Sequence, residues 1–456
     1  FNLPNNSIKI NGASTDYVGS VAEQTGAVVG FAVDMDGGHL WVHVNGTWIN
    51  GTPTFSDGTN KVASPNTDST YIPFWTGNGG GAMTWEVNFG QSSFTGTKPS
   101  GYKILNSSNL PEPSIGPNSL TKPGEHFNAL LYTGNGSDGH ARTGLGFKPD
   151  LVWIKPRSDA DNNVVFDSTR GVQKYMYSNS VGQEYTGTNS LTAFGTDGFT
   201  LNDWNNINEN SQTYVAWCWK ANGGTTSSNG EGATSSTVQA NTTAGFSIVG
   251  WTGTGSATTL GHGLDLKPQL IIVKNRTDGR NWTVYNEYNG GNGQMYFTTG
   301  AYSANSGSFN NTAPTATVFT VNSDQTTNES GDAMIAYCFH SVEGYSKFGV
   351  YTGNNALDQG RYVNTGFRPK FLLVKRADST GWWAVTDSVR STTNTIANTL
   401  DWSNTYSESS LTSDLKVDFL SNGFKLREQD AYYNGAGGKY IYLAIAEMPF
   451  KYANAR

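Results

Sequence analysis

The stretch Gly146-Phe-Lys-Pro-Asp-Leu-Val-Trp-Ile-Lys155 decides the fold class of this chain, because it recurs twice more. The later copies are Leu266-Lys-Pro-Gln-Leu-Ile-Ile-Val-Lys274 and Gly366-Phe-Arg-Pro-Lys-Phe-Leu-Leu-Val-Lys375. A proline at a strand entrance removes no ladder hydrogen bond, and the apolar run after it is typical of a buried strand. We therefore expect each copy to form a core strand, and the lysine that ends each run to mark where the strand leaves the core.

The regions around these three stretches also correspond. An aromatic-Thr-Gly motif precedes each one, beginning at Tyr132, Trp251 and Tyr351, and an apolar strand such as Tyr214-Val-Ala-Trp-Cys-Trp219 closes each repeat. A unit of about 100 residues can bury a core of its own, so the pattern predicts tandem domains rather than turns of a solenoid. Sustained helical periodicity is missing from the sequence, so we expect little helix.

The first part of the chain differs from the repeats. Val28 to Trp48 alternates apolar and polar residues across an Asp-Gly-Gly turn and an Asn-Gly turn, which predicts a ladder of β-hairpins. The expected organisation is a β-sandwich in 1–112, a Pro-rich linker in 113–125, repeats in 126–222, 244–341 and 345–456, and a flexible Gly/Ser/Thr linker in 223–243. The predicted fold class is all-β, a series of concanavalin-like β-sandwiches.

Composition and charge exclude several classes of partner. Charged residues make up 14% of the chain, against about 25% in typical soluble domains. The formal net charge of −7 offers no basic patch for a phosphate backbone, so nucleic acid is not an expected partner. Apolar runs are too short to span a bilayer, so no membrane insertion is expected. Because residue 1 is not Met and lies within the predicted N-terminal domain, we expect the protein to extend upstream.

The two cysteines, Cys218 and Cys338, occupy the same place in two different repeats. A disulfide between equivalent core positions of separate domains is geometrically unfavourable, so both are predicted to be buried free thiols.

Two resemblances follow from these motifs. Residues 28–105 are similar to the second half of a SPRY domain, which is a concanavalin-like β-sandwich. The three repeats resemble a domain of unassigned function from tail-fibre-like proteins of marine phages, on the strength of the 146–155 stretch, Phe166-Asp-Ser-Thr-Arg-Gly171 and Ile441-Tyr-Leu-Ala-Ile-Ala-Glu-Met-Pro-Phe450. The resemblance implies a virion protein and a homo-oligomer, expected to be a trimer.

Metal and catalytic sites are not predicted from the acidic and histidine residues. His39 and His43 lie four residues apart on a predicted strand, too far apart to share an ion. Asp34-Met-Asp-Gly37 starts like a calcium loop but lacks its later carboxylate. The carboxylate pairs Asp159 with Asp161 and Glu428 with Asp430 do not recur between repeats, and we interpret them as loop and turn residues. We therefore expect no metal, no cofactor and no enzymatic activity.

The Asp-Ser-x-Arg motif occurs in the first and third repeats but not in the second. It comprises Asp167 to Arg170 and Asp387 to Arg390, whereas the second repeat has Tyr285-Asn-Glu-Tyr-Asn289. An Asp with an Arg three residues later can close a turn by an ion pair, and the alternative is that Arg170 and Arg390 bind a ligand.

Exposed aromatic residues are the more favoured binding candidates. A sugar can stack its C–H face on an indole or phenol ring while nearby amides and carboxylates bind its hydroxyls. The candidates in polar loops or at strand entrances are Trp204, Trp382, Trp383, Tyr432 and Tyr433.

These patterns lead to a functional hypothesis. We expect an extracellular phage fibre or receptor-binding protein that contacts other virion proteins and attaches to a host-surface glycan or receptor. The alternatives are a purely structural fibre spacer and a polysaccharide-degrading tail enzyme.

Overall fold

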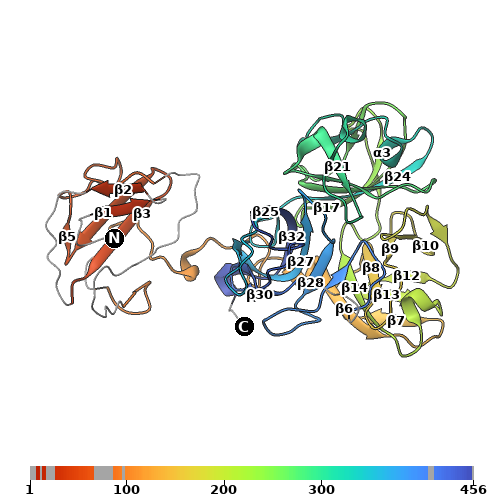
Figure 1. Ribbon diagram of the computed structural model, residues 1–456, viewed down its shortest axis with the longest axis horizontal. Coiled ribbons are helices and arrows are strands. Elements are labelled where there is room, and N and C mark those ends of the chain that lie inside the picture. Colours follow the sequence, from red (N-terminus) through yellow and green to blue (C-terminus); the bar gives the residue numbers. More distant parts are fainter. Residues whose placement is uncertain are drawn as a thin grey trace. The chain divides into compact units, whose positions relative to one another are not determined.

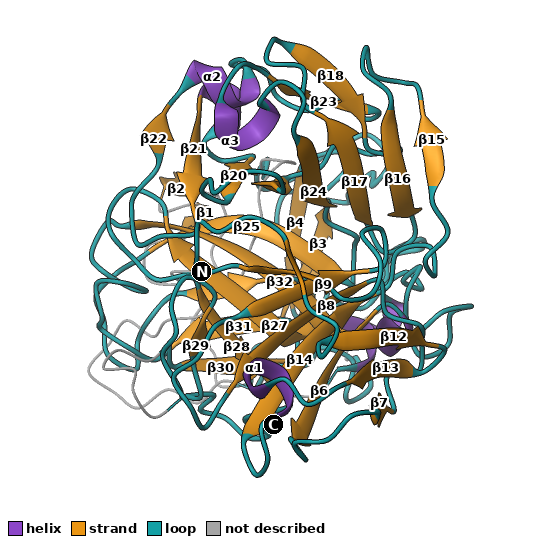
Figure 2. Ribbon diagram, turned by 90° about the vertical axis from the view of Figure 1, so that its right-hand side faces the viewer, coloured by secondary structure: helices purple, strands orange, loops and turns teal. Residues whose placement is uncertain are grey.

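The computed structural model describes residues 7–10, 13–16, 26–65, 86–94, 98–408 and 415–453. The chain divides into two compact units, Phe1–Leu110 and Pro111–Arg456 (Figure 1). Helix in the described part is limited to single turns (Figure 2): α1 (Asn205–Asn208), α2 (Ser306–Phe309), α3 (Gln325–Asn328), η2 (Ser107–Asn109), η3 (Pro123–Glu125), η4 (Gly290–Asn292) and η5 (Phe450–Tyr452). The prediction of an all-β fold is confirmed.

The first unit contains the predicted hairpins. Its described strands are β1 (Ser7–Ile10), β2 (Ala13–Asp16), β3 (Val29–Asp34), β4 (His39–Val44) and β5 (Thr47–Trp48). β1 pairs with β2, and β3, β4 and β5 form an antiparallel sheet in that order. Leu40 and Val42 of β4 pack against Val62 and Ala63 in a small core. Residues 66–85 and 95–97 of the stretch that resembles a SPRY domain lie outside the described residues, and the resemblance stays a prediction.

Repeat 1, residues 126–222, folds into a large and a small sheet. Its strands are β6 (Phe127–Thr133), β7 (His140–Thr143), β8 (Leu151–Pro156), β9 (Val164–Asp167), β10 (Lys174–Tyr177), β11 (Tyr185–Thr186), β12 (Leu191–Gly195), β13 (Gly198–Leu201) and β14 (Thr213–Trp219). The large sheet has the order β11-β10-β9-β8-β14-β6, and the small sheet has the order β12-β13-β7.

Repeat 2, residues 244–341, has the same plan. The strands of its region are β15 (Ser227–Asn229), β16 (Ser236–Asn241), β17 (Phe246–Thr252), β18 (Thr258–Gly261), β19 (Leu270–Asn275), β20 (Thr283–Asn286), β21 (Gly293–Tyr296), β22 (Ser303–Ala304), β23 (Val318–Val321) and β24 (Ala333–Phe339). The large sheet has the order β15-β16-β17-β24-β19-β20-β21-β22, and β18 pairs with β23.

Repeat 3, residues 345–456, follows the plan again. Its described strands are β25 (Ser346–Thr352), β26 (Tyr362–Asn364), β27 (Phe367–Arg376), β28 (Ala384–Asp387), β29 (Leu400–Asp401), β30 (Val417–Leu420), β31 (Gly423–Leu426) and β32 (Lys439–Pro449). The large sheet has the order β25-β32-β27-β28-β29, and the small sheet has the order β26-β31-β30. The three repeats are therefore structural copies.

The large sheets are buried on both faces, which explains their uninterrupted apolar runs. In β8, Leu151 and Trp153 point to one core while Val152 and Ile154 point to another, because successive side chains of a strand alternate. The first core is shared: it contains Trp153 and Trp217 of repeat 1, Tyr337 of repeat 2 and a large part of repeat 3. The second lies between the two sheets of repeat 1, and repeat 2 has its counterpart.

This shared core corrects the predicted domain organisation. We expected four domains with separate cores, but residues 111–456 form one compact unit with a continuous core through all three repeats. The repeats lie side by side in the second unit, in orange to yellow-green, green to teal and blue (Figure 1). One face of each large sheet is apolar and must be covered, and the other repeats cover it.

Both predicted linkers in this unit are also part of the fold. The 113–125 segment inserts Ile115, which is fully buried, into the shared core. The 223–243 segment forms β15 and β16, and β16 pairs with β17 from Thr237 to Asn241. Its serines and threonines are compatible with an edge hairpin, so the expectation of a flexible linker is wrong.

Equivalent contacts join the repeats in a cyclic order. A backbone N–H of one repeat donates to a carbonyl of the next, from Glu184 to Arg276 (2.9 Å), from Tyr302 to Ala377 (2.9 Å) and from Glu408 to Arg157 (3.0 Å). Three further equivalent bonds run from the Nζ atoms of Lys155, Lys274 and Lys375 to the carbonyls of Thr405 (3.2 Å), Val181 (3.3 Å) and Thr299 (3.4 Å). The second unit thus has an approximate threefold arrangement within one chain.

These lysines were expected to mark the point where each strand leaves the core, and that expectation is wrong. All three are fully buried. Burial lowers the pKa of Lys155 to about 8 and the pKa values of Lys274 and Lys375 to about 7. Each ammonium is held by backbone carbonyls, including one from a neighbouring repeat, so the lysines fix the interfaces.

Candidate ligand-binding site

Four aromatic side chains gather at the surface of repeat 1. Tyr175 lies at the centre, 4.4 Å from the Trp204 ring and 5.5 Å from the rings of Tyr177 and Tyr185. Tyr185 is 37% exposed and the other three are half-buried. We call Tyr175, Tyr177, Tyr185 and Trp204 the repeat 1 aromatic cluster.

The strands and two close glycine contacts position the cluster. Tyr175 and Tyr185 are cross-strand partners of β10 and β11, and Tyr177 lies on the same face as Tyr175, two residues along β10. A Cβ atom on Gly182 would lie 2.5 Å from the Tyr185 hydroxyl, and one on Gly187 would lie 3.1 Å from the Tyr175 ring. The glycines therefore let the loop pass close to the rings.

The polar surroundings of the cluster can bind hydroxyl groups. Trp204 is flanked in the sequence by the exposed residues Asp203 and Asn205. Asn206 donates to Asp161 Oδ1 (2.6 Å), and both residues are half-buried. Burial raises the pKa values of Tyr175 and Tyr177, so both phenols stay protonated and can donate hydrogen bonds at neutral pH.

The repeats supply an internal comparison for Trp204. Asn208, Asn328 and Asn434 are equivalent: each is fully buried and accepts a backbone N–H of the loop after the aromatic-Thr-Gly motif. Each also donates its own N–H to the carbonyl four residues earlier, which belongs to Trp204, Asp324 or Asp430. Repeats 2 and 3 therefore carry an aspartate where repeat 1 carries Trp204.

The two aspartates perform a local structural task that Trp204 cannot perform. Asp324 Oδ1 accepts from the Thr326 N–H (2.8 Å), and Asp430 Oδ1 accepts from the Tyr432 N–H (2.6 Å). Trp204 stands at the N-cap of α1 and makes no side-chain cap hydrogen bond. Replacing a good N-cap typically costs about 0.5–2 kcal/mol. An aspartate at position 204 would therefore stabilise this turn better than the tryptophan does.

Tyr175 and Tyr185 have no aromatic counterpart in repeat 2, whereas strand register makes Tyr177 equivalent to Tyr296. β-sheet register makes Tyr175 equivalent to Gln294 in repeat 2, and Tyr185 equivalent to Ser303. Repeat 3 has Thr399 and Asp401 at the positions of Tyr175 and Tyr177, since Ala384 pairs with Asp401 as Val164 pairs with Tyr177. The shared fold does not require the cluster.

A family comparison covers most of the second unit. The model of the family described as "Domain of unknown function (DUF7483)" matches residues 122–449. The chain belongs to the DUF7483 family. No curated protein and no solved structure matches the chain. The DUF7483 match spans all three repeats, in agreement with the shared core.

A second aromatic group lies in repeat 3 of the DUF7483 region. Trp382 lies 5.8 Å from the Tyr406 ring and 5.7 Å from the Tyr432 ring. Tyr406 is 41% exposed, and Trp382 and Tyr432 are half-buried. We call Trp382, Tyr406 and Tyr432 the repeat 3 aromatic cluster. Sequence reasoning identified Trp382 and Tyr432 but missed Tyr406, as it missed Tyr175, Tyr177 and Tyr185 in repeat 1.

The expectation that Trp383 and Tyr433 are exposed is wrong. Both are fully buried in the shared core, and the Trp383 indole N–H donates to the Tyr296 carbonyl of repeat 2 (2.8 Å). The adjacent pairs Trp382-Trp383 and Tyr432-Tyr433 each have one ring inside and one at the surface. Neither buried ring can stack on a sugar.

Arg170 and Arg390 are likewise unavailable as ligand-binding residues, because both side chains are fully buried. Arg170 pairs with Asp167 and donates to the Val165 carbonyl (2.9 Å). Arg390 makes the same contacts with Asp387 (2.6 Å) and the Val385 carbonyl (3.0 Å). The predicted role in closing the turn is confirmed.

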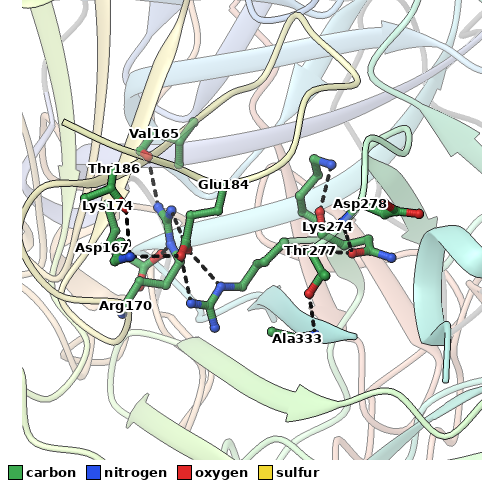
Figure 3. A network of polar contacts seen from close by, with 12 residues as sticks. Val165, Asp167, Arg170, Lys174, Glu184, Thr186, Lys274, Thr277, Asp278 and Ala333 are labelled. Carbon is green, nitrogen blue, oxygen red and sulfur yellow. Dashed lines mark hydrogen bonds and ion pairs between the residues drawn. The ribbon is translucent and has the colours of Figure 1, made fainter. Parts of the chain in front are cut away.

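These pairs also hold the repeats together. Glu184 of repeat 1 contacts Arg170 and receives two hydrogen bonds from Arg276 of repeat 2, at 2.9 and 3.1 Å (Figure 3). Although burial opposes ionisation, the two arginines lower the pKa of Glu184, so it is a carboxylate at neutral pH. Glu408 of repeat 3 joins Arg390 to Arg157 of repeat 1 in the same way.

The remaining acidic candidates have structural partners. Asp161 binds Asn206, Glu428 pairs with Lys416 (3.0 Å), and Asp34 Oδ1 accepts the N–H groups of Asp36 and Gly37 in a turn. Asp159 is exposed and accepts the Ala160 N–H.

One group of three carboxylates, Asp278, Glu329 and Asp332, is close enough in the described residues to hold an ion. Arg280 pairs with Asp278 and Glu329, and Asn275 donates to Asp332 (2.7 Å), so protein donors already serve these oxygens.

His39 and His43 have separate partners within the first unit. His39 Nδ1 lies 3.4 Å from an Asp34 carboxylate oxygen, and His43 Nδ1 accepts from the Gly46 N–H (3.2 Å). Cys218 and Cys338 are buried free thiols in the cores of repeats 1 and 2, as predicted. Among the described residues, no helix is long and apolar enough to cross a membrane.

Proposed function

We propose that this chain is a carbohydrate-binding protein of a phage fibre, which attaches the particle to a glycan on the host surface. The repeat 1 aromatic cluster supports the binding part of this proposal. The resemblance of the repeats to marine phage tail-fibre-like proteins supports the fibre part, and with it a location on the virion and contacts with other virion proteins.

Trp204 is the observation that carries the proposal. A half-buried indole replaces the aspartate that accepts a backbone N–H at the equivalent position of the two other repeats. It lies beside Tyr175, whose position holds Gln294 in repeat 2 and Thr399 in repeat 3. Trp204 makes no capping hydrogen bond, but it adds a ring to an aromatic surface. Ligand binding is the best explanation for a tryptophan at this position. Flat rings bordered by amides, hydroxyls and carboxylates match the alternating C–H and hydroxyl surfaces of a sugar.

A fibre can use weak sites of this kind. Each copy of the chain has one repeat 1 aromatic cluster, and a homotrimeric fibre would present three of them in parallel. Linked sites raise the effective concentration of each partner, so overall avidity can exceed the single-site affinity by about 10²–10⁴.

A glycan array tests the proposal. The chain would be displayed multivalently on beads and compared with Trp204→Ala and Tyr185→Ala. We expect a defined set of glycans to bind the parent protein. Each variant should weaken that binding by at least about tenfold, as for a hot-spot aromatic residue whose truncation costs about 2 kcal/mol.

Tyr288→Ala is the matched control, because Tyr288 is a 46% exposed aromatic residue of repeat 2 outside both clusters. It should bind like the parent protein. Failure of the parent protein to bind any glycan would favour a structural spacer. The release of new reducing ends from host polysaccharide would instead favour a degrading enzyme.

A further inference from the structure

The two aromatic clusters are connected through the interface between repeats 1 and 3. Lys155 Nζ donates to the Asp161 carbonyl (2.8 Å) of repeat 1 and to the Thr405 carbonyl (3.2 Å) of repeat 3. Thr405 immediately precedes Tyr406 of the repeat 3 cluster. Asp161 binds Asn206, which lies two residues after Trp204 of the repeat 1 cluster. The two clusters therefore flank one buried lysine.

The region between the clusters is polar. Asp161, Asn162, Asn206 and Thr405 are all half-buried there, so each still reaches solvent. Asn179 donates to Asn162 Oδ1 (2.8 Å), and the Asn162 N–H donates to Asp161 Oδ1 (2.7 Å). The two aromatic surfaces can stack on separate sugar units of one chain, and the amide and hydroxyl groups between them can bind the hydroxyls of the units in between.

The charges of this region favour an uncharged ligand. Lys155 is fully buried, and Arg157 is paired with Glu408 (3.0 Å). The carboxylates of Asp159 and Asp203 next to the clusters are exposed, while the cations there are paired, Lys174 with Glu184 (3.9 Å) and Arg376 with Asp378 (2.9 Å). A chain of uronic acids or sulfated sugars would face these carboxylates without a nearby free cation among the described residues.

The repeat 3 cluster is also specific to its repeat. The inter-repeat hydrogen bonds make Tyr406 equivalent to Gly182 in repeat 1 and Gly300 in repeat 2. Trp382 precedes the buried Trp383, which is equivalent to Trp282 because their indole N–H groups donate to the carbonyls of Tyr296 and Tyr177. The residue before Trp282 is Asn281, and the corresponding residue of repeat 1 is Asn162. Repeat 3 thus places rings where the other copies have glycine and asparagine.

We propose that the two clusters form one extended site across the interface between repeats 1 and 3, and that it binds an uncharged linear oligosaccharide longer than a disaccharide. This inference rests on the proposed function and makes it specific. Repeats 1 and 3 are not consecutive in the sequence, so the site exists only when the third repeat closes onto the first.

The test uses the whole chain and ladders of uncharged linear oligosaccharides. Cello-, malto-, laminari-, manno- and fully N-acetylated chito-oligosaccharides from the dimer to the hexamer would be immobilised, and binding would be measured by biolayer interferometry. For the ladder that binds, affinity should rise at least about tenfold from dimer to hexamer, since a second contact region adds to the first. Tyr406→Ala and Trp382→Ala should reduce hexamer affinity to the level of the dimer.

The outcomes separate the two proposals. If the parent protein binds short and long members equally, or if Tyr406→Ala leaves hexamer affinity unchanged, the extended site is wrong while the glycan-binding function stands. If no ladder and no array glycan binds the parent protein, both are wrong. Tyr406 is 41% exposed, so Tyr406→Ala should fold even if Trp382→Ala does not. Tyr288→Ala again serves as the unaffected control.

Discussion

At the scale of single residues, the interface positions change together from repeat to repeat. Tyr337 of repeat 2 donates to Asp167 of repeat 1 (2.7 Å), and Trp217 of repeat 1 donates to Asp387 of repeat 3 (3.0 Å). In the third interface, between repeats 2 and 3, Asn286 occupies the position that Asp167 and Asp387 hold in the other two. Strand register places Leu443 where the donor would be, since Leu443 pairs with Leu373 as Trp217 pairs with Trp153.

This pattern has a physical reason. A buried carboxylate needs a cation and hydrogen-bond donors, and removing either leaves an uncompensated charge. The interface between repeats 2 and 3 lacks the carboxylate, the arginine and the donor together. Its turn remains closed, because Asn286 Oδ1 accepts the Asn289 N–H (3.0 Å) as Asp167 accepts the Arg170 N–H (2.9 Å).

The first prediction follows from this difference. Arg170→Asn leaves Asp167 buried without its cation and should lower the free energy of unfolding by about 3–5 kcal/mol. The double variant Asp167→Asn with Arg170→Asn reproduces the pair found in repeat 2 and should recover part of that loss. Urea unfolding followed by tryptophan fluorescence measures both. A double variant less stable than Arg170→Asn would contradict the explanation.

Residue types allowed some of these contacts to be predicted. The Asp-Ser-x-Arg spacing indicated the turn-closing ion pair, and the two equivalent cysteines indicated buried thiols. Burial of Trp383 and Tyr433 could not be predicted, because Trp383 precedes β28 and Tyr433 lies in a turn, where no strand or helix period says which of two adjacent rings faces the core. Tyr175, Tyr177 and Tyr185 were missed, although the alternation of Tyr175 and Tyr177 along the sequence was an available signal.

At the scale of elements, the strands were predictable and their partners were not. The apolar runs after the prolines indicated β8, β19 and β27 correctly. The uninterrupted apolar runs indicated that these strands are buried on both faces. We expected the same repeat to cover both faces of its large sheet. The neighbouring repeats cover one of them, and no pattern within a single repeat contains that information.

The second prediction concerns the hairpin of β15 and β16. Composition suggested a flexible linker, but β16 is an inner strand of the large sheet and Val238 is 3% exposed in the core of repeat 2. Native-state digestion with thermolysin should therefore leave residues 236–241 intact at times when exposed loops are cut. Rapid cleavage within 236–241, located by mass spectrometry, would show that the hairpin is not formed.

At the scale of the whole molecule, the shared core makes three repeats into one folding unit. Buried lysines at equivalent positions, together with Glu184 and Glu408, bond each repeat to its neighbour. Separation of one repeat from the others would expose the aromatic face that it contributes to the shared core. A homotrimer was expected from the resemblance to fibre proteins. An approximate threefold arrangement is already present within a single chain.

The third prediction uses the titration of the buried lysines. Burial lowers the pKa of Lys274 from the ordinary 10.5 to about 7, so between these values the unfolded chain binds more protons than the folded chain. Stability should therefore rise with pH over this range, by the linkage relation. Above about pH 10 it should fall again, because burial raises the pKa values of tyrosines such as Tyr132 and Tyr351 in the folded state.

Thermal unfolding of residues 111–456 at several pH values measures this dependence. Lys274→Met removes one titrating group and should flatten the rise between pH 7 and 10.5. A parent protein whose stability declines steadily from pH 7 upward would contradict the assignment of these lysines as buried groups with lowered pKa values.

The most direct test of the account is the substitution Trp204→Asp, measured for both stability and glycan binding. This variant places in repeat 1 the residue that repeats 2 and 3 use at the same position, where it can cap α1. A cap contributes about 0.5–2 kcal/mol, which offsets the packing lost with a half-buried indole. We expect a thermal midpoint close to that of the parent protein together with loss of glycan binding. A sharply lowered midpoint, or unchanged binding to the array, would show that Trp204 serves the fold and not a ligand.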